Sequence, residues 1–211
     1  MDGSVQNRRV GPPRAGIAER IWDAARSEFS RRGYHGARVQ GIARGASCNV
    51  ALMYRHWASK RALYLDILRA VWLGAAGEIA RLVEQGPAGA SAVVGAYLDA
   101  MMADPMGAQI LIREYLDGAP FFAQLAQADP TMLEPVRRAA SAFAAGNGGS
   151  AIDPMLALVM VGGLAALVAS AKEAARPFLA EPIPTEEWRR HVFDLLVNGL
   201  RPARVNGGLA L

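Results

Sequence analysis

Apolar residues in the first part of the chain recur at the spacing of an amphipathic helix. Ile17, Ile21, Ala25 and Phe29 lie four residues apart, and charged side chains stand between them. Gly33 follows four residues later, and glycine commonly ends a helix in the left-handed conformation. The pattern predicts a helix that begins at Ile17 and ends at Gly33.

Two short helices and a longer one are predicted to follow. The second helix covers residues 39–46 and the third covers residues 50–56, with a tight turn between them. Asn49 is a favourable N-cap for the third helix, because its side-chain oxygen can accept a free backbone N–H. Ser59 is a similar cap for a fourth helix, which is expected to run to about Val83.

The rest of the chain shows the same periodicity, interrupted by proline and glycine. It predicts helices over residues 90–103, 106–116, 120–127, 131–145, 153–175 and 185–200. Two starts fit the fourth of these: a capping box of Thr131 with Glu134, or the pair Asp129-Pro130. The most apolar stretch, residues 155–171, falls short of the about 18 residues of a membrane span. No stretch alternates as a strand does, so we predict an all-α protein.

Breaks in this pattern divide the chain into four parts. Residues 1–16 are rich in glycine, proline and arginine, which predicts a flexible basic arm. Residues 17–68 are expected to form a small domain of short helices, and residues 69–201 a larger helical domain. Residues 202–211 show no helical pattern and are predicted to be a tail.

Charge is distributed unevenly along the 211 residues. Residues 1–72 contain 13 lysines and arginines against 5 acidic residues, a net charge of +8, whereas the remainder carries −4. This excess favours a polyanionic partner for the small domain, because phosphate contacts supply the non-specific affinity of DNA-binding proteins. A single cysteine, Cys48, and the lack of an apolar signal-peptide core behind the N-terminal arginines indicate a cytoplasmic protein.

The order of the first helices adds a geometric argument. Two short helices joined by a tight turn, after a longer first helix, form the helix-turn-helix arrangement that sets a recognition helix into the major groove of DNA. Similar spacing occurs in ordinary helical bundles. Geometry and charge together favour DNA binding.

A more specific pattern lies across the same region. Gly33-Tyr34, Ile42-Ala43 and the stretch Met-Tyr-Arg-His-Trp-Ala-Ser-Lys-Arg-Ala-Leu at 53–63 resemble the N-terminal domain of the tetracycline-repressor (TetR) family of bacterial regulators. That family has a Gly-aromatic pair after its first helix, Ile-Ala in its second, and Leu-Tyr-x-His-Phe-x-Ser-Lys-x-x-Leu between its third and fourth. The resemblance runs without gaps from about Ile21 to Leu68. It implies a homodimeric DNA-binding regulator, most commonly a repressor that a ligand releases from its operator.

The resemblance also implies which residues contact DNA. Tyr54, His56 and Lys60 match positions that reach phosphates, to which hydroxyl, imidazole and ammonium groups can donate. Tyr54 also fits a place in the core, and Asn49 fits a role as a cap alone. The groove-facing positions correspond to Gln40, Asn49, Val50, Ala51, Leu52 and Arg55; among these, Arg55 suits guanine, and Gln40 or Asn49 suits adenine.

The chain departs from the family at some of these positions. Val50 and Leu52 stand where polar residues are usual, so base readout is expected to depend on few polar groups. Ala37-Arg38 replaces the Ser or Thr that commonly caps the second helix. Arg38 is expected to compensate through a phosphate contact.

Beyond about Arg69 the resemblance is architectural only. It implies that the last two long helices, about residues 153–175 and 185–200, pair with those of a second copy. The first of these is too apolar to be solvated on all sides, and Gly162-Gly163 allows close helix approach. Burial of that helix within one chain is the alternative.

A ligand pocket is implied among the middle helices. Its expected ligand is a small apolar or amphipathic molecule that stabilises a conformer with wrongly spaced recognition helices. Aromatic and flexible side chains suit such a pocket, with Arg113 and Glu114 as polar anchors, although each also fits ordinary core packing. The candidate residues are Tyr97, Met101, Met102, Met106, Arg113, Tyr115, Phe121 and Phe122.

Three other interpretations differ from a DNA-binding regulator of this kind. An enzyme is not expected, because the sequence has no Gly-rich phosphate loop, no metal-ligand spacing among its three histidines and no Ser/His/Asp motif. No cofactor or metal is therefore predicted. A redox-responsive regulator would use Cys48, for which an inert, buried thiol is the competing interpretation. A helical protein-interaction module that no longer reads DNA is the third, because Val50-Ala51-Leu52 is apolar.

Overall fold

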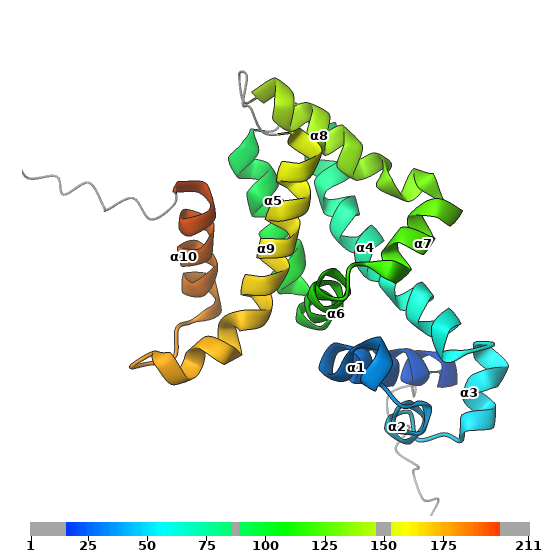
Figure 1. Cartoon of the computed structure of the whole chain (residues 1–211). Helices are drawn as coiled ribbons and strands as arrows, with labels where there is room; N and C mark the ends of the chain where they lie inside the picture. The colour runs from blue at the N-terminus through cyan, green and yellow to red at the C-terminus, as the bar shows by residue number, and fades with distance from the viewer. Residues whose placement is uncertain (1–15, 86–88, 147–152, 199–211) are drawn as a thin grey trace, which may run out of the picture.

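The computed structural model describes residues 16–85, 89–146 and 153–198, and every regular element in these ranges is a helix (Figure 1). The prediction of an all-α protein is confirmed. The predicted arm, apart from Gly16, and the predicted tail lie outside the described residues. The elements are α1 (Ile17–Gly36), α2 (Val39–Gly45), α3 (Val50–His56), α4 (Lys60–Glu84), α5 (Ala90–Ala103), α6 (Pro105–Leu116), α7 (Pro120–Ala128), the 3-10 helix η1 (Pro130–Leu133), α8 (Glu134–Gly146), α9 (Pro154–Ala175), the 3-10 helix η2 (Arg176–Phe178) and α10 (Thr185–Asn198).

Helix boundaries in the first part of the chain follow the predicted signals. Gly33 has a φ of 65° and interrupts α1 before a last turn that continues to Gly36. Asn49 caps α3 by accepting the Leu52 N–H at 2.7 Å. Ser59 caps α4 in the same way, through the Ala62 N–H at 3.0 Å.

The sequence is compatible with two starts for α8, at the capping box of Thr131 with Glu134 or at Asp129-Pro130. Asp129 accepts the backbone N–H of Thr131 at 3.2 Å, so the helical segment begins at Pro130. Its first turn is the 3-10 helix η1, and the α-helix begins only at Glu134. Of the two predicted starts, Asp129-Pro130 is therefore the correct one.

The first three helices and the first turns of α4 form a compact head. Its core contains fully buried side chains from four different helices: Ile21 and Phe29 of α1, Ile42 of α2, Met53 of α3 and Leu63 of α4. Met53 is the buried residue of α3. Because α3 is held mainly through one side chain, most of its surface is left for other contacts.

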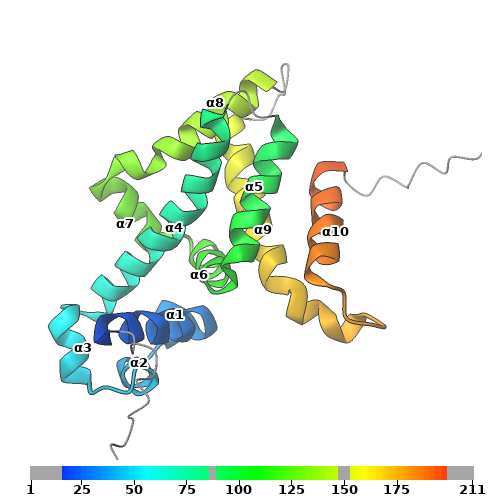
Figure 2. The same cartoon turned by 180° about the vertical axis from the view of Figure 1, so that it is seen from behind.

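The remaining helices form the body, and α4 connects the two parts without a break (Figures 1 and 2). A buried stripe on α4, including Ile67, Val71 and Ile79, runs beyond the domain boundary that the sequence predicted after Leu68. Helices α5 and α8 pack against α4, and α9 packs against α5, α6 and α8. Helix α6 contacts both α1 and α9, so it lies between the head and the body. None of the described helices is long and apolar enough to span a membrane.

The two glycines of α9 face aromatic residues of the same chain. A Cβ atom at Gly162 would lie 3.2 Å from the ring of Tyr97, and one at Gly163 would lie 4.0 Å from the ring of Tyr115. Gly162 therefore permits a close approach of the Tyr97 ring of α5, whereas the contact at Gly163 is an ordinary one.

Helix α2 begins at a residue whose side chain does not cap it, and a neighbouring helix supplies an acceptor. The carboxylate of Glu28, on α1, is largely buried and accepts the Arg38 backbone N–H at 3.4 Å. Arg32 donates to the same carboxylate at 3.1 Å. A Cβ atom at Gly41 would lie 2.9 Å from Oε1 of Glu28, so glycine at this position leaves room for the carboxylate.

We expect Gly41→Ala to lower the free energy of unfolding by about 1 kcal/mol, because the added methyl displaces a buried, hydrogen-bonded carboxylate. Gly74→Ala is the matched control, since nothing lies within 4 Å of a Cβ atom there. In that helix interior, alanine is expected to raise stability by about 0.5–1 kcal/mol. Urea unfolding of both variants measures the difference. Equal stabilisation by the two substitutions would contradict the packing described for Glu28.

Candidate functional site

The outer face of α3 presents the residues that the sequence predicted for DNA. Ala51, Tyr54 and Arg55 are exposed and lie at positions i, i+3 and i+4, which share one face of a helix. Tyr54 is 46% exposed and therefore does not belong to the core. His56, Gln40 and Arg38 are exposed as well.

Three predicted groove-facing residues have a second role in the head. Val50 and Leu52 are half-buried, so only part of each side chain is free for a thymine methyl. The side-chain oxygen of Asn49 is engaged by the Leu52 N–H. Arg55 and Gln40 are thus the exposed polar side chains among the predicted base-reading residues.

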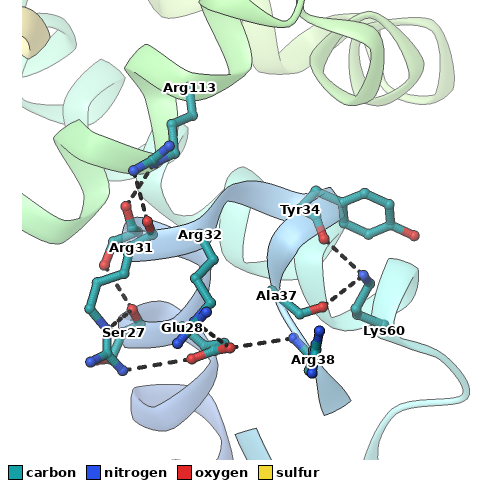
Figure 3. A network of polar contacts seen from close by, with 10 residues as sticks. Ser27, Glu28, Arg31, Arg32, Tyr34, Ala37, Arg38, Lys60 and Arg113 are labelled. Atoms are coloured by element: carbon teal, nitrogen blue, oxygen red, sulfur yellow. Dashed lines mark hydrogen bonds and ion pairs between the residues drawn. The ribbon is translucent and has the colours of Figure 1, made fainter. Parts of the chain in front are cut away.

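Lys60 is held by the protein itself. Its ammonium group donates to the carbonyl oxygens of Tyr34 at 2.8 Å and Ala37 at 3.0 Å, and it lies 4.4 Å from the centre of the Tyr34 ring (Figure 3). These bonds join the first turn of α4 to the end of α1 and the α1–α2 connection. An ammonium group has three N–H donors, so one remains for the predicted phosphate contact.

Arg113 of α6 connects the head to the body. Its guanidinium group donates to the carbonyl oxygens of Ser30 and Arg31, both at 2.8 Å (Figure 3). These carbonyls lie just before the break at Gly33, where helix carbonyls lose their usual partners and carry partial negative charge. An ion pair between Arg26 of α1 and Asp104 supports the same junction.

The next residue, Glu114, is buried. Its carboxylate accepts the Tyr64 hydroxyl at 3.0 Å and the backbone N–H groups of Phe121 and Phe122 at 2.7 and 2.9 Å. Burial, and then the negative charge of Glu114, raise the pKa of Tyr64 far above its usual value, so the phenol stays protonated as a donor. Glu114 therefore joins α4, α6 and the start of α7.

An apolar cavity of about 450 Å³ opens beside Glu114. This volume lies within the range of about 300–1,000 Å³ that is typical of small-molecule sites. Two of its lining residues, Glu114 and Arg137, carry charge, and the others are mostly large and apolar. The lining consists of Trp72, Leu111, Glu114, Tyr115, Ala119, Phe122, Leu133, Val136, Arg137, Met155 and Val159.

The predicted pocket residues are divided among several places. Tyr115 and Phe122 line the cavity, and Tyr97 and Met101 line a small hollow beside it. Phe121 instead packs against the rings of Tyr34 and Tyr64 at the head, with ring centres 4.4 and 5.1 Å apart.

Arg113, Met102 and Met106 lie outside the described cavity lining. Arg113 belongs to the contact with α1, and Met106 is exposed near the start of α6. The predicted pocket residues did not include Trp72, Val136 and Met155, which line the cavity. Helical periodicity shows which face of a helix is apolar, but it does not show where the apolar faces of neighbouring helices enclose a cavity.

Cys48 is half-buried against the core of the head. Within the described ranges, no group of three or more His, Cys, Asp and Glu residues is placed to hold a metal ion.

Comparison with known proteins gives a family match for the head. Residues 21–67 match the model of the bacterial regulatory proteins of the tetR family. A search of curated proteins gave no match. These matched residues include α2, α3 and the start of α4, which carry the predicted DNA contacts.

Solved structures resemble the chain over nearly its whole length. A transcriptional regulator from Streptomyces coelicolor is 26% identical, covers 86% of this chain and 96% of its own, and has a TM-score of 0.58. The fatty acid degradation regulator FadR from Bacillus halodurans is 18% identical, with coverages of 90% and 99% and a TM-score of 0.60. FadR from Bacillus subtilis, solved with stearoyl-CoA, is 18% identical, with coverages of 87% and 100% and a TM-score of 0.57.

The helix-turn-helix head, the match over residues 21–67 and the shared all-helical architecture agree with one another. The match over residues 21–67 identifies the head as a DNA-binding domain of the kind found in the tetR family of bacterial regulatory proteins, and the whole chain has the fold of the solved transcriptional regulators.

Proposed function

We propose that this regulator is a dimeric repressor that leaves its operator when a small apolar or amphipathic molecule enters the cavity. One observation carries the proposal. Glu114 lines the cavity, and the adjacent residue, Arg113, holds the end of α1 in the head. Two consecutive residues of α6 thus contact the two sites that must communicate.

The coupling follows from these contacts. A ligand in the cavity meets the α6 residues Leu111, Glu114 and Tyr115. Any shift of α6 that accommodates it is transmitted through Arg113 to α1, which packs against α2 and α3. A ligand that favours the shifted conformer then changes operator affinity by the difference in its binding to the two states, typically about 1–3 kcal/mol.

Small-molecule release is also supported by the comparisons. FadR from Bacillus subtilis shares the fold and was solved with stearoyl-CoA. At 18% identity this likeness shows the fold alone, and it supports the proposal of a small-molecule response without naming the ligand.

In the proposed DNA complex, Tyr54, His56, Arg38 and Lys60 contact phosphates, and sequence is read mainly by Arg55. The exposure of Arg55 and the commitment of the Asn49 oxygen to the α3 cap support this division. Gln40, Val50, Ala51 and Leu52 supply the remaining groove contacts.

The dimer is proposed to form through α9 and α10. Exposed apolar side chains recur along α9 at helical spacing: Leu156, Met160, Leu164 and Leu167. Leu195 of α10 is exposed as well. A stripe of this kind is unusual on a solvated helix and suits the matching stripe of a second copy.

The DNA-binding proposal is tested by gel shift with duplex from upstream of the protein's own gene and with random duplex, at two salt concentrations. We expect discrimination of about 10³ or more and weaker binding at higher salt. Arg55→Ala is expected to cost about 1–3 kcal/mol on the specific duplex. Arg138→Ala is the control, because Arg138 is an exposed arginine on α8, outside both the head and the proposed dimer helices (Figure 1). If this duplex binds no better than random duplex, selection from a random library locates the operator; failure of that selection would contradict the proposal.

Replacing Arg113 with methionine keeps the apolar stem but removes the bonds to Ser30 and Arg31. We expect a loss of about 1 kcal/mol in stability, because two helix-end carbonyls lose a charged donor. With an inducer found by thermal-shift screening, the inducer-dependent change in operator affinity should also shrink. Arg81→Met, which removes only an ion pair with Glu78 on the same exposed helix surface, should change stability by less than about 0.5 kcal/mol. An unchanged inducer response in Arg113→Met would exclude this route of coupling.

The dimer surface is tested by introducing one charge. Leu164→Arg should shift the protein from dimer to monomer in analytical ultracentrifugation, since a buried, unpaired charge opposes association. Operator affinity should fall by at least about tenfold when the two heads no longer act together. Leu73→Arg on α4 is the matched control, because Leu73 and Leu164 are both 44% exposed. Dissociation by Leu73→Arg, and not by Leu164→Arg, would place the interface elsewhere.

A further inference from the structure

A small hollow adjoins the cavity, and two tyrosines, Tyr97 and Tyr115, are among the residues that line it. The hollow, of about 20 Å³, shares Trp72, Leu111, Tyr115, Val136 and Val159 with the cavity and is also lined by Ala75, Tyr97, Met101 and Gly162. Such a volume suffices for about one water-sized group. The absence of a side chain at Gly162 is what lets the Tyr97 ring approach α9 this closely.

Both phenols are neutral donors in this environment. Tyr97 is only 5% exposed, and burial followed by the neighbouring Tyr115 raises its pKa far above the usual value. Tyr115 is 37% exposed, and the burial of the rest of its side chain raises its pKa in the same direction. Each phenol therefore keeps its proton and can donate one hydrogen bond.

Tyr97 and Tyr115 differ from Tyr64 in their hydrogen bonding. Tyr64 donates to Glu114, whereas the described part of the chain gives no hydrogen-bond partner to the hydroxyl of Tyr97 or of Tyr115. A ligand that supplies an acceptor to either hydroxyl therefore gains a hydrogen bond without breaking one within the described part of the protein.

The charges around the cavity disfavour an anion at this place. Glu114 contributes a negative charge to the wall, and its oxygens are already engaged by three donors. Arg137 is the cation among the described lining residues, and it is half-exposed and paired with Glu134 at 2.7 Å. A carboxylate in the hollow would thus be desolvated near a like charge without a free cation.

We propose that the effector is a neutral molecule with an apolar body and one hydrogen-bond-accepting oxygen, such as a ketone or an ester, which Tyr97 and Tyr115 bind as donors. The apolar body lies against Trp72, Phe122 and Val136. The inference rests on the proposed function in one respect, that this cavity is the effector site.

Calorimetric titration of the full chain without DNA tests the proposal with three probes of equal length. They are a medium-chain methyl ketone, the alkene in which CH₂ replaces the carbonyl oxygen, and the corresponding fatty acid at neutral pH. We expect the ketone to bind about tenfold more tightly than the alkene, the usual worth of one or two hydrogen bonds. The fatty acid should bind at least about tenfold more weakly than the ketone.

The double variant Tyr97→Phe, Tyr115→Phe identifies the donors. Its ketone affinity should fall about tenfold while its alkene affinity stays within about twofold, so that the preference for oxygen disappears. The alkene serves as the internal control, because its binding reports whether the variant is folded and its cavity intact. Should the variant fail to fold, the single variants are measured in the same way.

The proposal is overturned if the fatty acid or stearoyl-CoA binds as tightly as the ketone, if no probe binds, or if the phenylalanine variants retain the preference for the ketone. These measurements contain no DNA. Failure of the operator gel shift would therefore contradict the proposed function alone, and failure here would contradict the inferred ligand alone.

Discussion

The buried carboxylate of Glu114 is the interaction on which the relation of head and body depends. A buried charge is tolerated only when hydrogen bonds compensate for lost hydration, and here the Tyr64 hydroxyl and two backbone N–H groups of α7 do so. Because those donors come from different helices, the requirement fixes α4, α6 and α7 relative to one another. Arg113, one residue earlier, extends the arrangement to α1.

Glu28 is a second buried carboxylate, inside the head, that accepts a backbone N–H at a helix start. Neither α2 nor α7 has a side chain of its own that caps its first turn, since the N-cap residues are Arg38 and Ala119. In each case a buried glutamate from an adjacent helix accepts a backbone N–H at the helix start. The interaction stabilises both groups: the helix start gains an acceptor for a free backbone N–H, and the buried carboxylate lies near the partial positive charge of the helix start. Tertiary contacts thus replace local caps at two places that bear on function.

Helix α9 takes part in both proposed binding events. Met155 and Val159 line the cavity, whereas Leu156, Met160 and Leu164 are exposed on a neighbouring part of the helix surface. A ligand that moves α9 would therefore act on the proposed dimer surface as well as on α6. The spacing between the two recognition helices of the proposed dimer depends on the dimer surface and on the contact of α6 with α1. The proposed effector could therefore change this spacing through either of them.

The sequence by itself determined the all-helical class, most helix boundaries and the helix-turn-helix head. These properties depend on local patterns: apolar periodicity, the caps Asn49 and Ser59, and the left-handed glycine at Gly33. The resemblance pointed to Tyr54 and Arg55 as DNA contacts but left a place in the core open for Tyr54, and both residues are exposed.

Only the tertiary structure decided which side chains meet across helices. It assigned the Lys60 ammonium to carbonyl oxygens of the head, placed Arg113 at the end of α1 instead of in the cavity, and turned Gly162 toward Tyr97. Each outcome depends on the packing of helices 23 to 83 residues apart in sequence, as the separations of the Lys60 and Arg113 contacts show. Periodicity identifies the buried face of a helix, but the partner of that face is set by how all the helices pack together.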